Sequence, residues 1–96
     1  MNYILNYKKS PHFEERLRSR HIDSFLVSMC LVKGAMKQAK KNNIEYTLNK
    51  ESITQAITQG YISVRDCLGV MSLTVVVKGN ILITVFTKMG DTGIAN

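Results

Sequence analysis

A histidine and two arginines follow one another at intervals of four residues near the start of the chain, in the stretch SPHFEERLRSRHI. They are His12, Arg16 and Arg20, and residues four apart share one side of an α-helix. An imidazole can act as a general acid or base, and a planar guanidinium can hold a phosphate through two parallel hydrogen bonds. The spacing is typical of a site for a nucleic-acid phosphate, and also of a solvated helix face.

A second group of candidate residues is basic. Lys37, Lys40 and Lys41 form a cluster that could follow a phosphate backbone. Lys88 ends the last β-rich run, where it could reach a ligand, and Tyr46 could stack on a base. For the lysines a solvated surface is the alternative, and for Tyr46 a position in the core.

The composition limits the kind of protein. Ninety-six residues suit one domain, spanning residues 1–96, and 45% hydrophobic residues can fill one modest core. Thirteen Lys and Arg against seven Asp and Glu give a formal charge of +6. This balance favours RNA, DNA or an acidic protein as a partner. We expect neither a secretory signal peptide nor a membrane span.

The cysteines and histidines do not suggest a metal. Cys30 and Cys67 each stand among apolar residues, and there is no C-x-x-C pair. They are typical of reduced core cysteines in a cytoplasmic protein. The histidines lack a companion at metal-ligand spacing, and no Gly-rich phosphate loop occurs. We therefore expect no metal and no cofactor.

The first helix should position the His/Arg stripe. Ser10 can cap a helix that runs from Pro11 to about residue 19 or 20. At about 100° per residue, the stripe drifts toward the buried side of that helix. We expect His12 to be exposed, Arg16 to lie at the boundary of the core, and Arg20 to lie almost against it.

Two further helices are expected. Asp23 or Ser24 caps the second, roughly 24–33, which is apolar on nearly all sides and should be central and buried. Gly34 is a suitable residue to end it. The segment 49–60 has apolar residues at helical spacing and predicts a short third helix.

Strands fill most of the rest. The segments 35–41 and 44–48 are expected to form a hairpin, although a second helix continuing through Lys41 is a competing interpretation. The segment 61–66 is a further predicted strand, followed by a turn. Residues 1–9 favour a short edge strand or an arm.

The clearest pattern is LTVVVKGNILITVFTK, residues 73–88. Two β-branched runs flank Gly79-Asn80, which is a typical two-residue hairpin connector. Both faces are apolar, so these strands should lie inside the sheet. The predicted partners are Val77 with Leu82, Val75 with Thr84, Leu73 with Phe86, and Val76 with Ile83.

Helices followed by a mostly antiparallel sheet predict an α+β domain. We expect two N-terminal helices packed on a sheet of about four strands, with the short third helix as an addition. One face of the sheet should carry the helices, and the other should be partly open.

Residues 12–34 resemble a family of small bacterial and phage domains with the pattern H-x-x-x-R-x-x-x-R-x-I and a helix that ends in glycine. The matching residues are His12, Arg16, Arg20, Ile22 and Gly34. The family closes with apolar strands of the type that VVV and ITV form here, at 75–77 and 83–85. It looks like the RelE-type group of toxins and related ribonucleases, with the barnase, EndoU, colicin and RelE-like fold.

The resemblance implies a metal-independent RNA endonuclease or toxin-like domain. In such a reaction a base removes the 2′-hydroxyl proton and that oxygen attacks the adjacent phosphate. His12 would be the acid or base, Arg16 and Arg20 would hold the phosphate, and Lys88 would assist. An inhibitor or antitoxin protein would be a partner.

A non-catalytic protein is the alternative. The same fold could serve a plasmid or phage accessory protein that binds nucleic acid or a host protein. It could also be an interaction module whose sheet is completed by a partner chain, which would give a homodimer.

Overall fold

A computed structural model describes residues 7–62 and 69–89. Over these ranges three helices and a five-stranded sheet confirm the predicted α+β class, with one strand more than the expected four. The elements are β1 (Lys8–Lys9), α1 (Pro11–Ser19), α2 (Ser24–Lys33), β2 (Ala35–Gln38), the 3-10 turn η2 (Lys40–Asn42), β3 (Ile44–Leu48), α3 (Lys50–Thr58), β4 (Val70–Lys78) and β5 (Ile81–Met89).

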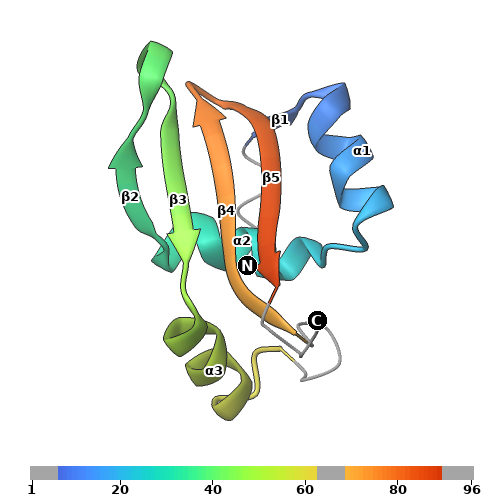
Figure 1. Ribbon diagram of the computed structural model, residues 1–96, viewed down its shortest axis with the longest axis vertical. Helices are drawn as coiled ribbons and strands as arrows, with labels where there is room; N and C mark the ends of the chain where they lie inside the picture. Colours follow the sequence, from blue (N-terminus) through green and yellow to red (C-terminus); the bar gives the residue numbers. More distant parts are fainter. Residues whose placement is uncertain (1–6, 63–68, 90–96) are drawn as a thin grey trace.

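The sheet has the order β1-β5-β4-β3-β2 (Figure 1). All neighbours are antiparallel except β1, which pairs in parallel with the start of β5. The predicted edge strand in 1–9 is therefore confirmed for Lys8–Lys9, and residues 1–6 lie outside the described ranges.

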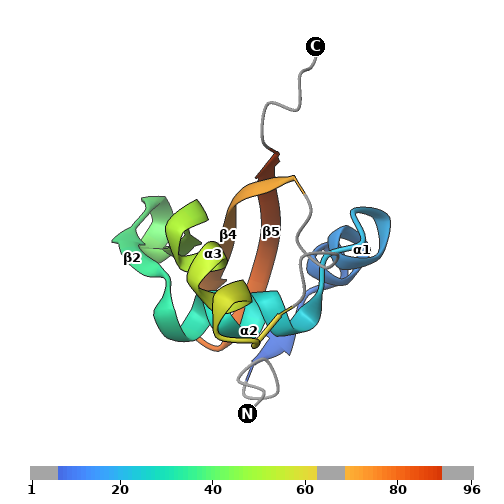
Figure 2. The ribbon, with the colours of Figure 1, turned by 90° about the horizontal axis from the view of Figure 1, so that it is seen from below.

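The helices leave one face of the sheet open. Helix α2 crosses behind β3 and β4, α1 lies beside β5, and α3 lies near the start of β4 (Figure 1). Seen from below, α2 is on one side of β4 and β5, and none of the three helices covers their other side (Figure 2). The core fills the space between α2 and the sheet, and its fully buried members include Val27, Cys30, Leu73, Val75 and Val85.

The predicted helix starts are confirmed by their caps. The Ser10 side-chain oxygen accepts a hydrogen bond from the Phe13 amide at 3.0 Å, and Asp23 caps α2 in the same way. These acceptors satisfy amides that the first helical turn leaves without a partner. Phe13 is fully buried and fixes α1 against the core.

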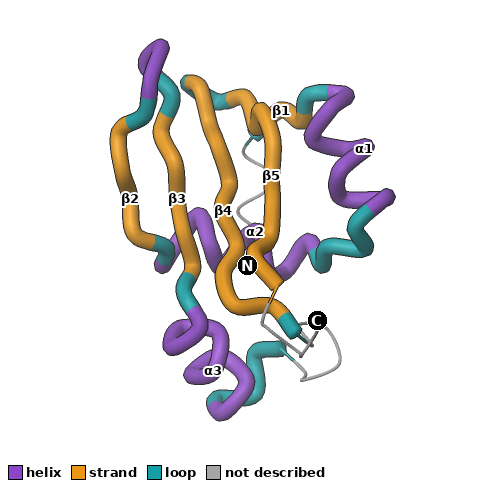
Figure 3. Tube along the Cα trace, in the orientation of Figure 1, coloured by secondary structure: helices purple, strands orange, loops and turns teal. Residues whose placement is uncertain are grey.

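The β2–β3 hairpin is confirmed, and the competing long second helix is wrong. Gly34 ends α2 in an extended conformation, and a Cβ there would collide with the Cys30 carbonyl oxygen. The chain then turns back through η2, the short helical turn at the hairpin tip (Figure 3). Lys41 and Asn42 both adopt positive φ there, at 61° and 64°.

The predicted register of the β4–β5 hairpin is correct only near its turn. Val77 pairs with Leu82 as expected, but a bulge at Ile83 shifts the pairs from Val76 to Ser72 by one residue, and a second shift beyond Ser72 pairs Val70 with Met89. Val75 therefore pairs with Val85, and Val76 with Thr84. Leu73 likewise pairs with Thr87 and not with Phe86. The cause is that a bulge adds one unpaired residue to a strand and reverses the faces of the residues beyond it.

Three other expectations need correction or fall outside the structure. Within the predicted strand 61–66, Tyr61 and Ile62 form a bend after α3, and 63–68 lie outside the described residues, as does Cys67. The turn predicted before residue 73 is shorter than expected, because β4 already begins at Val70.

Candidate nucleic-acid interface

The face of the sheet that α2 does not cover is called the open face here. Residues paired across strands point to the same face, and alternate residues along a strand share it. Its centre is lined by hydroxyls and one aromatic ring, and its margins by charged groups. Its members are Lys37 on β2, Glu45 and Thr47 on β3, Ser72, Thr74, Val76 and Lys78 on β4, and Thr84, Phe86 and Lys88 on β5.

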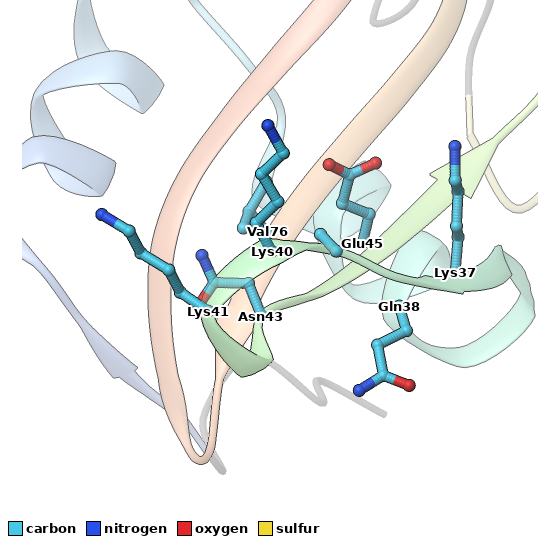
Figure 4. A pocket seen from close by; sticks show the side chains of 8 residues that line it. Lys37, Gln38, Lys40, Lys41, Asn43, Glu45 and Val76 are labelled. Atoms are coloured by element: carbon cyan, nitrogen blue, oxygen red, sulfur yellow. The ribbon is translucent and has the colours of Figure 1, made fainter.

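One end of the open face holds a shallow hollow of about 620 Å³, called the lysine hollow here. Lys37, Lys40 and Lys41 line it together with Glu45, and in Figure 4 all four charged groups extend to one side of the β2–β3 hairpin. Gln38 points the other way (Figure 4). Gln38, Ala39, Asn43 and Val76 complete its lining.

Local structure explains why these lysines meet. Lys37 pairs directly with Glu45, so their side chains share a face. The tip then closes through the Ala39 amide, which donates to the Asn43 carbonyl at 2.8 Å. Lys41 has a positive φ at this tip, and the side chains of Lys40 and Lys41 extend to the same side of the hairpin as Lys37 (Figure 4). Three ammonium groups against one carboxylate leave the hollow a formal charge of +2.

Tyr46 does not join the three lysines. It lies between Glu45 and Thr47 on β3 and so projects to the helix side of the sheet, where it packs half-buried against the core. The pKa of Tyr7 is raised, first by burial and then by the nearby Tyr46 phenol. Of the four residues predicted to bind nucleic acid, three share the hollow, and Tyr46 belongs to the opposite face.

Arg16 connects α1 to the edge of β5. Its Nε donates to the Val85 carbonyl at 3.3 Å, and the Ser10 hydroxyl donates to the Ile83 carbonyl at 2.9 Å. The side chain is half-buried, as the helical wheel predicted. This bond uses one of the five N–H donors of a guanidinium. His12, one turn earlier, is exposed, again as predicted.

Arg20 lies where the helical wheel did not place it. Helix α1 ends at Ser19, and Arg20 is an exposed residue of the following turn. The prediction that it nears the core is wrong because a wheel applies only while the backbone stays helical. Arg20 therefore points its charge into solvent beside α1.

The candidate catalytic residues are spread along β5. The start of α1 is fixed at Ile83 by Ser10, whereas Lys88 lies five residues further along the strand. At the usual rise per residue this is about 16 Å. Lys88 is exposed and pairs with Ser72 on the open face. His12 and Lys88 thus belong to opposite ends of β5, with Arg16 between them.

Sequence reasoning missed Phe86 as a surface residue. It was expected opposite Leu73 in a strand apolar on both faces, but it pairs with Thr74 on the open face and is 41% exposed. The Thr and Lys residues in TVFTK are typical of a strand with one exposed face, but they do not indicate the bulge at Ile83 that turns Phe86 to that face.

Cys30 is a core thiol and not a nucleophile. Burial raises its pKa to about 12. Its Sγ donates to the Tyr46 carbonyl at 3.0 Å and to the Leu73 carbonyl at 3.4 Å. Reactive cysteines need a thiolate at neutral pH, and this environment opposes it.

The described residues show neither a cluster of metal ligands nor a membrane-spanning helix. Over residues 7–62 and 69–89, no three side chains of His, Cys, Asp or Glu gather where they could hold a metal ion. Within the same ranges, no helix is long and apolar enough to cross a membrane.

Comparisons with protein-family models, with curated proteins and with solved structures find no match for this chain. The resemblance to RelE-type domains therefore depends on the motif residues alone and stays a prediction.

Proposed function

We propose that this protein binds nucleic acid, and RNA in particular, through the lysine hollow and the adjoining open face. The observation that carries the proposal is the convergence of Lys37, Lys40 and Lys41 on one side of the β2–β3 hairpin. Lysine ammonium groups attract a phosphate backbone and release its counterions. The formal charge of +6 on the whole chain acts in the same direction.

Binding is preferred to catalysis because the candidate catalytic residues lie far apart, whereas the candidate binding residues lie close together. A transesterification site must bring its acid, base and cations to one phosphate. The lysines meet in one hollow, whereas the candidates from His12 to Lys88 extend along β5. A basic surface needs only charges that follow a backbone, and the open face supplies them.

Metal-independent RNA cleavage is the second candidate function, favoured by one observation. Arg16 is anchored to β5 through Val85, one turn after the exposed His12. His12 would take the proton of a 2′-hydroxyl while its oxygen forms a bond to the adjacent phosphorus. The bond to the 5′-oxygen breaks, that oxygen receives a proton from an acid, and the products carry a 2′,3′-cyclic phosphate and a 5′-hydroxyl. Arg16 and Arg20 would hold the phosphate, and Lys88 would assist.

Partners follow from each function. An RNA-cleaving domain would need an inhibitor or antitoxin protein in its own cell, whereas an accessory protein would not. Homodimerisation through a sheet edge fits either function. We infer a cytoplasmic setting, in which the buried Cys30 thiol stays reduced.

The test of binding replaces the lysines of the hollow while keeping its shape. In the triple variant Lys37→Gln, Lys40→Gln and Lys41→Asn, we expect weaker binding of a labelled RNA oligonucleotide, measured by fluorescence anisotropy at several salt concentrations. Each lost contact should reduce the slope of log K against log salt by about 0.7 on a single strand, and three lost contacts by about 2.

The matched control is Lys50→Gln, which removes one charge at the start of α3, away from the hollow. It should leave the slope unchanged. An unchanged slope in the triple variant, or no binding by the native protein at low salt, would reject the proposal.

A further inference from the structure

We propose that the open face takes a single-stranded nucleic acid and that Phe86 is the platform on which one of its bases stacks. This inference depends on the proposed function, because it assumes that the partner is a nucleic acid. It adds the strandedness of that partner and assigns a contact residue outside the lysine hollow.

Phe86 is a large apolar residue of the sheet that is partly exposed to solvent. Its side chain is 41% exposed although it stands in the middle of a nine-residue strand. The bulge at Ile83 turns it to the open face, and the same shift turns Val85 into the core, where it is fully buried. The fold therefore keeps a large apolar ring in water and buries its smaller neighbour.

The surroundings of the ring are polar and suit the edges of a base. Phe86 pairs with Thr74, which is nearly buried and whose hydroxyl lies 3.1 Å from that of the half-buried Thr47, so Thr47 and Thr84 are the hydroxyls nearer to solvent. Thr84 and Lys88 flank it on the same strand and face. Hydroxyls can donate to or accept from a base edge, and the exposed ammonium of Lys88 can meet a phosphate.

The ring is also within reach of the lysine hollow. Val76 lines the hollow and pairs with Thr84, two residues before Phe86. Val76 and Phe86 are thus diagonal neighbours on one face, and such neighbours are typically about 7–8 Å apart. A strand whose base lies on Phe86 can place adjoining phosphates against Lys37 and Lys40 on one side and Lys88 on the other.

This arrangement selects a single strand by a simple physical requirement. A base presents its flat face to an aromatic ring only when it is not stacked between neighbours in a duplex. Lysines alone would accept the backbone of either form. Phe86 therefore favours unpaired RNA or DNA, and the hydroxyls of the face add contacts that unpaired base edges can use.

The test compares one labelled oligonucleotide as a single strand and as a duplex, in RNA and DNA forms, on the full chain. We expect tighter binding of the single strand. Phe86→Leu should weaken it on the order of tenfold while leaving duplex binding unchanged, and Phe86→Tyr should bind as the native protein does. A 2-aminopurine base in the strand should lose fluorescence on binding the native protein and not on binding Phe86→Leu.

The matched control is Tyr61→Leu. Tyr61 is an exposed aromatic in the bend after α3, with its ring 5.5 Å from the Lys33 ammonium of α2, and lies off the open face. Its loss should not change binding. Circular dichroism checks that each variant folds. If Phe86→Leu does not fold, quenching of 2-aminopurine by the native protein alone tests whether a base stacks on the ring.

The outcomes separate this inference from the proposed function. If Phe86→Leu binds single strands as well as the native protein does, or if 2-aminopurine is not quenched, the stacking platform is rejected, while a lysine-dependent salt slope still supports the proposed function. Equal affinity for duplex and single strand also rejects it. If the native protein binds neither form at low salt, both proposals fail together.

Discussion

Arg16 is a candidate phosphate-binding residue that also stabilises the fold. The edge of β5 beyond β1 presents backbone carbonyls that no strand pairs, at Ile83 and Val85. Ser10 and Arg16 donate to these two groups. Donors that cover an exposed edge also prevent another chain from pairing with it. Loss of activity in an Arg16 variant would therefore mix an effect on the site with an effect on the fold.

We predict that Arg16→Ala lowers the free energy of unfolding by about 1 kcal/mol, since a long, half-exposed bond to a charged donor is lost. For a domain of this size the melting temperature should fall by about 4–8 °C, measured by circular dichroism. Arg18→Ala, an exposed arginine of the same helix, is the control and should change stability by less than about 0.5 kcal/mol. Equal effects of the two substitutions would contradict the assigned role.

Cys30 gives a prediction about pH. Its pKa in the folded protein is raised to about 12, mainly by burial, whereas an exposed thiol ionises near its ordinary pKa of 9.0. The unfolded chain therefore loses the proton first, and stability must fall as pH rises from about 9 toward 12. The slope from this thiol should approach about 1.4 kcal/mol per pH unit within that window.

Other side chains also ionise in that pH range, so the effect of Cys30 is measured as the difference in unfolding free energy between two variants. Urea unfolding at pH 8, 9, 10 and 11 is compared between Cys67→Ser and the double variant Cys67→Ser, Cys30→Ala. The gap between the two should narrow as pH rises. A gap that stays constant would show that Cys30 does not resist ionisation in the folded protein.

At the scale of elements, the β2–β3 turn places a charged residue in a backbone conformation that lowers stability. Lys41 occupies the left-handed region, with φ 61°, where a residue with a Cβ is disfavoured and asparagine is tolerated better than lysine. Strain of this kind persists where function requires it. The lysine that occupies it lines the hollow.

We predict opposite effects of one substitution on stability and binding. Lys41→Asn should raise the free energy of unfolding by about 0.5–1 kcal/mol while weakening RNA binding. Lys40→Asn is the control, since Lys40 is not among the residues of positive φ. It should weaken binding without raising stability. A Lys41→Asn variant that binds RNA as well as the native protein would remove Lys41 from the interface.

The elements themselves were largely predictable. Caps and breakers such as Ser10, Asp23 and Gly34 act over a few residues, so the sequence predicted the helix bounds within one or two positions. The bulge at Ile83 was not predictable, because a β-branched residue fits a regular strand as well as a bulge. One unpaired residue then moved Thr84, Phe86 and Lys88 together to the open face.

The candidate site was predicted in part for the same reason. Lys37, Lys40 and Lys41 are close in sequence, and a hairpin brings close residues together. Tyr46 packs against the core, as the alternative interpretation predicted, because alternation along β3 separates it from Glu45. Contacts between distant segments, such as Arg16 with Val85, depend on packing that no local pattern specifies.

At the scale of the whole molecule, the two faces of the sheet differ, because the described helices pack against only one of them. Among the described residues, α2 lies on one side of the sheet and α1 lies beside β5, so the core packs between α2 and the sheet and no described helix covers the open face (Figures 1 and 2). That face can then carry hydroxyls, charges and one exposed ring. His12 is exposed on α1, the helix that lies beside β5.

This position gives the prediction for the second candidate function. If the protein cleaves RNA, the native chain should produce fragments with 2′,3′-cyclic phosphate and 5′-hydroxyl ends in the presence of EDTA. His12→Ala should slow cleavage by roughly 10²–10⁴-fold, the usual contribution of a general acid or base. It should leave both stability and RNA affinity unchanged, because His12 is exposed and lies outside the lysine hollow.

His12 is a better test of cleavage than Arg16, whose removal also exposes the edge of β5. The matched control is His21→Asn, a second exposed histidine, in which asparagine suits the positive φ of 52°. If the native protein cleaves and His12→Ala cleaves equally fast, the assignment of His12 is wrong. If the native protein binds RNA with the expected salt slope and leaves it intact, cleavage is rejected, and the open face serves binding alone.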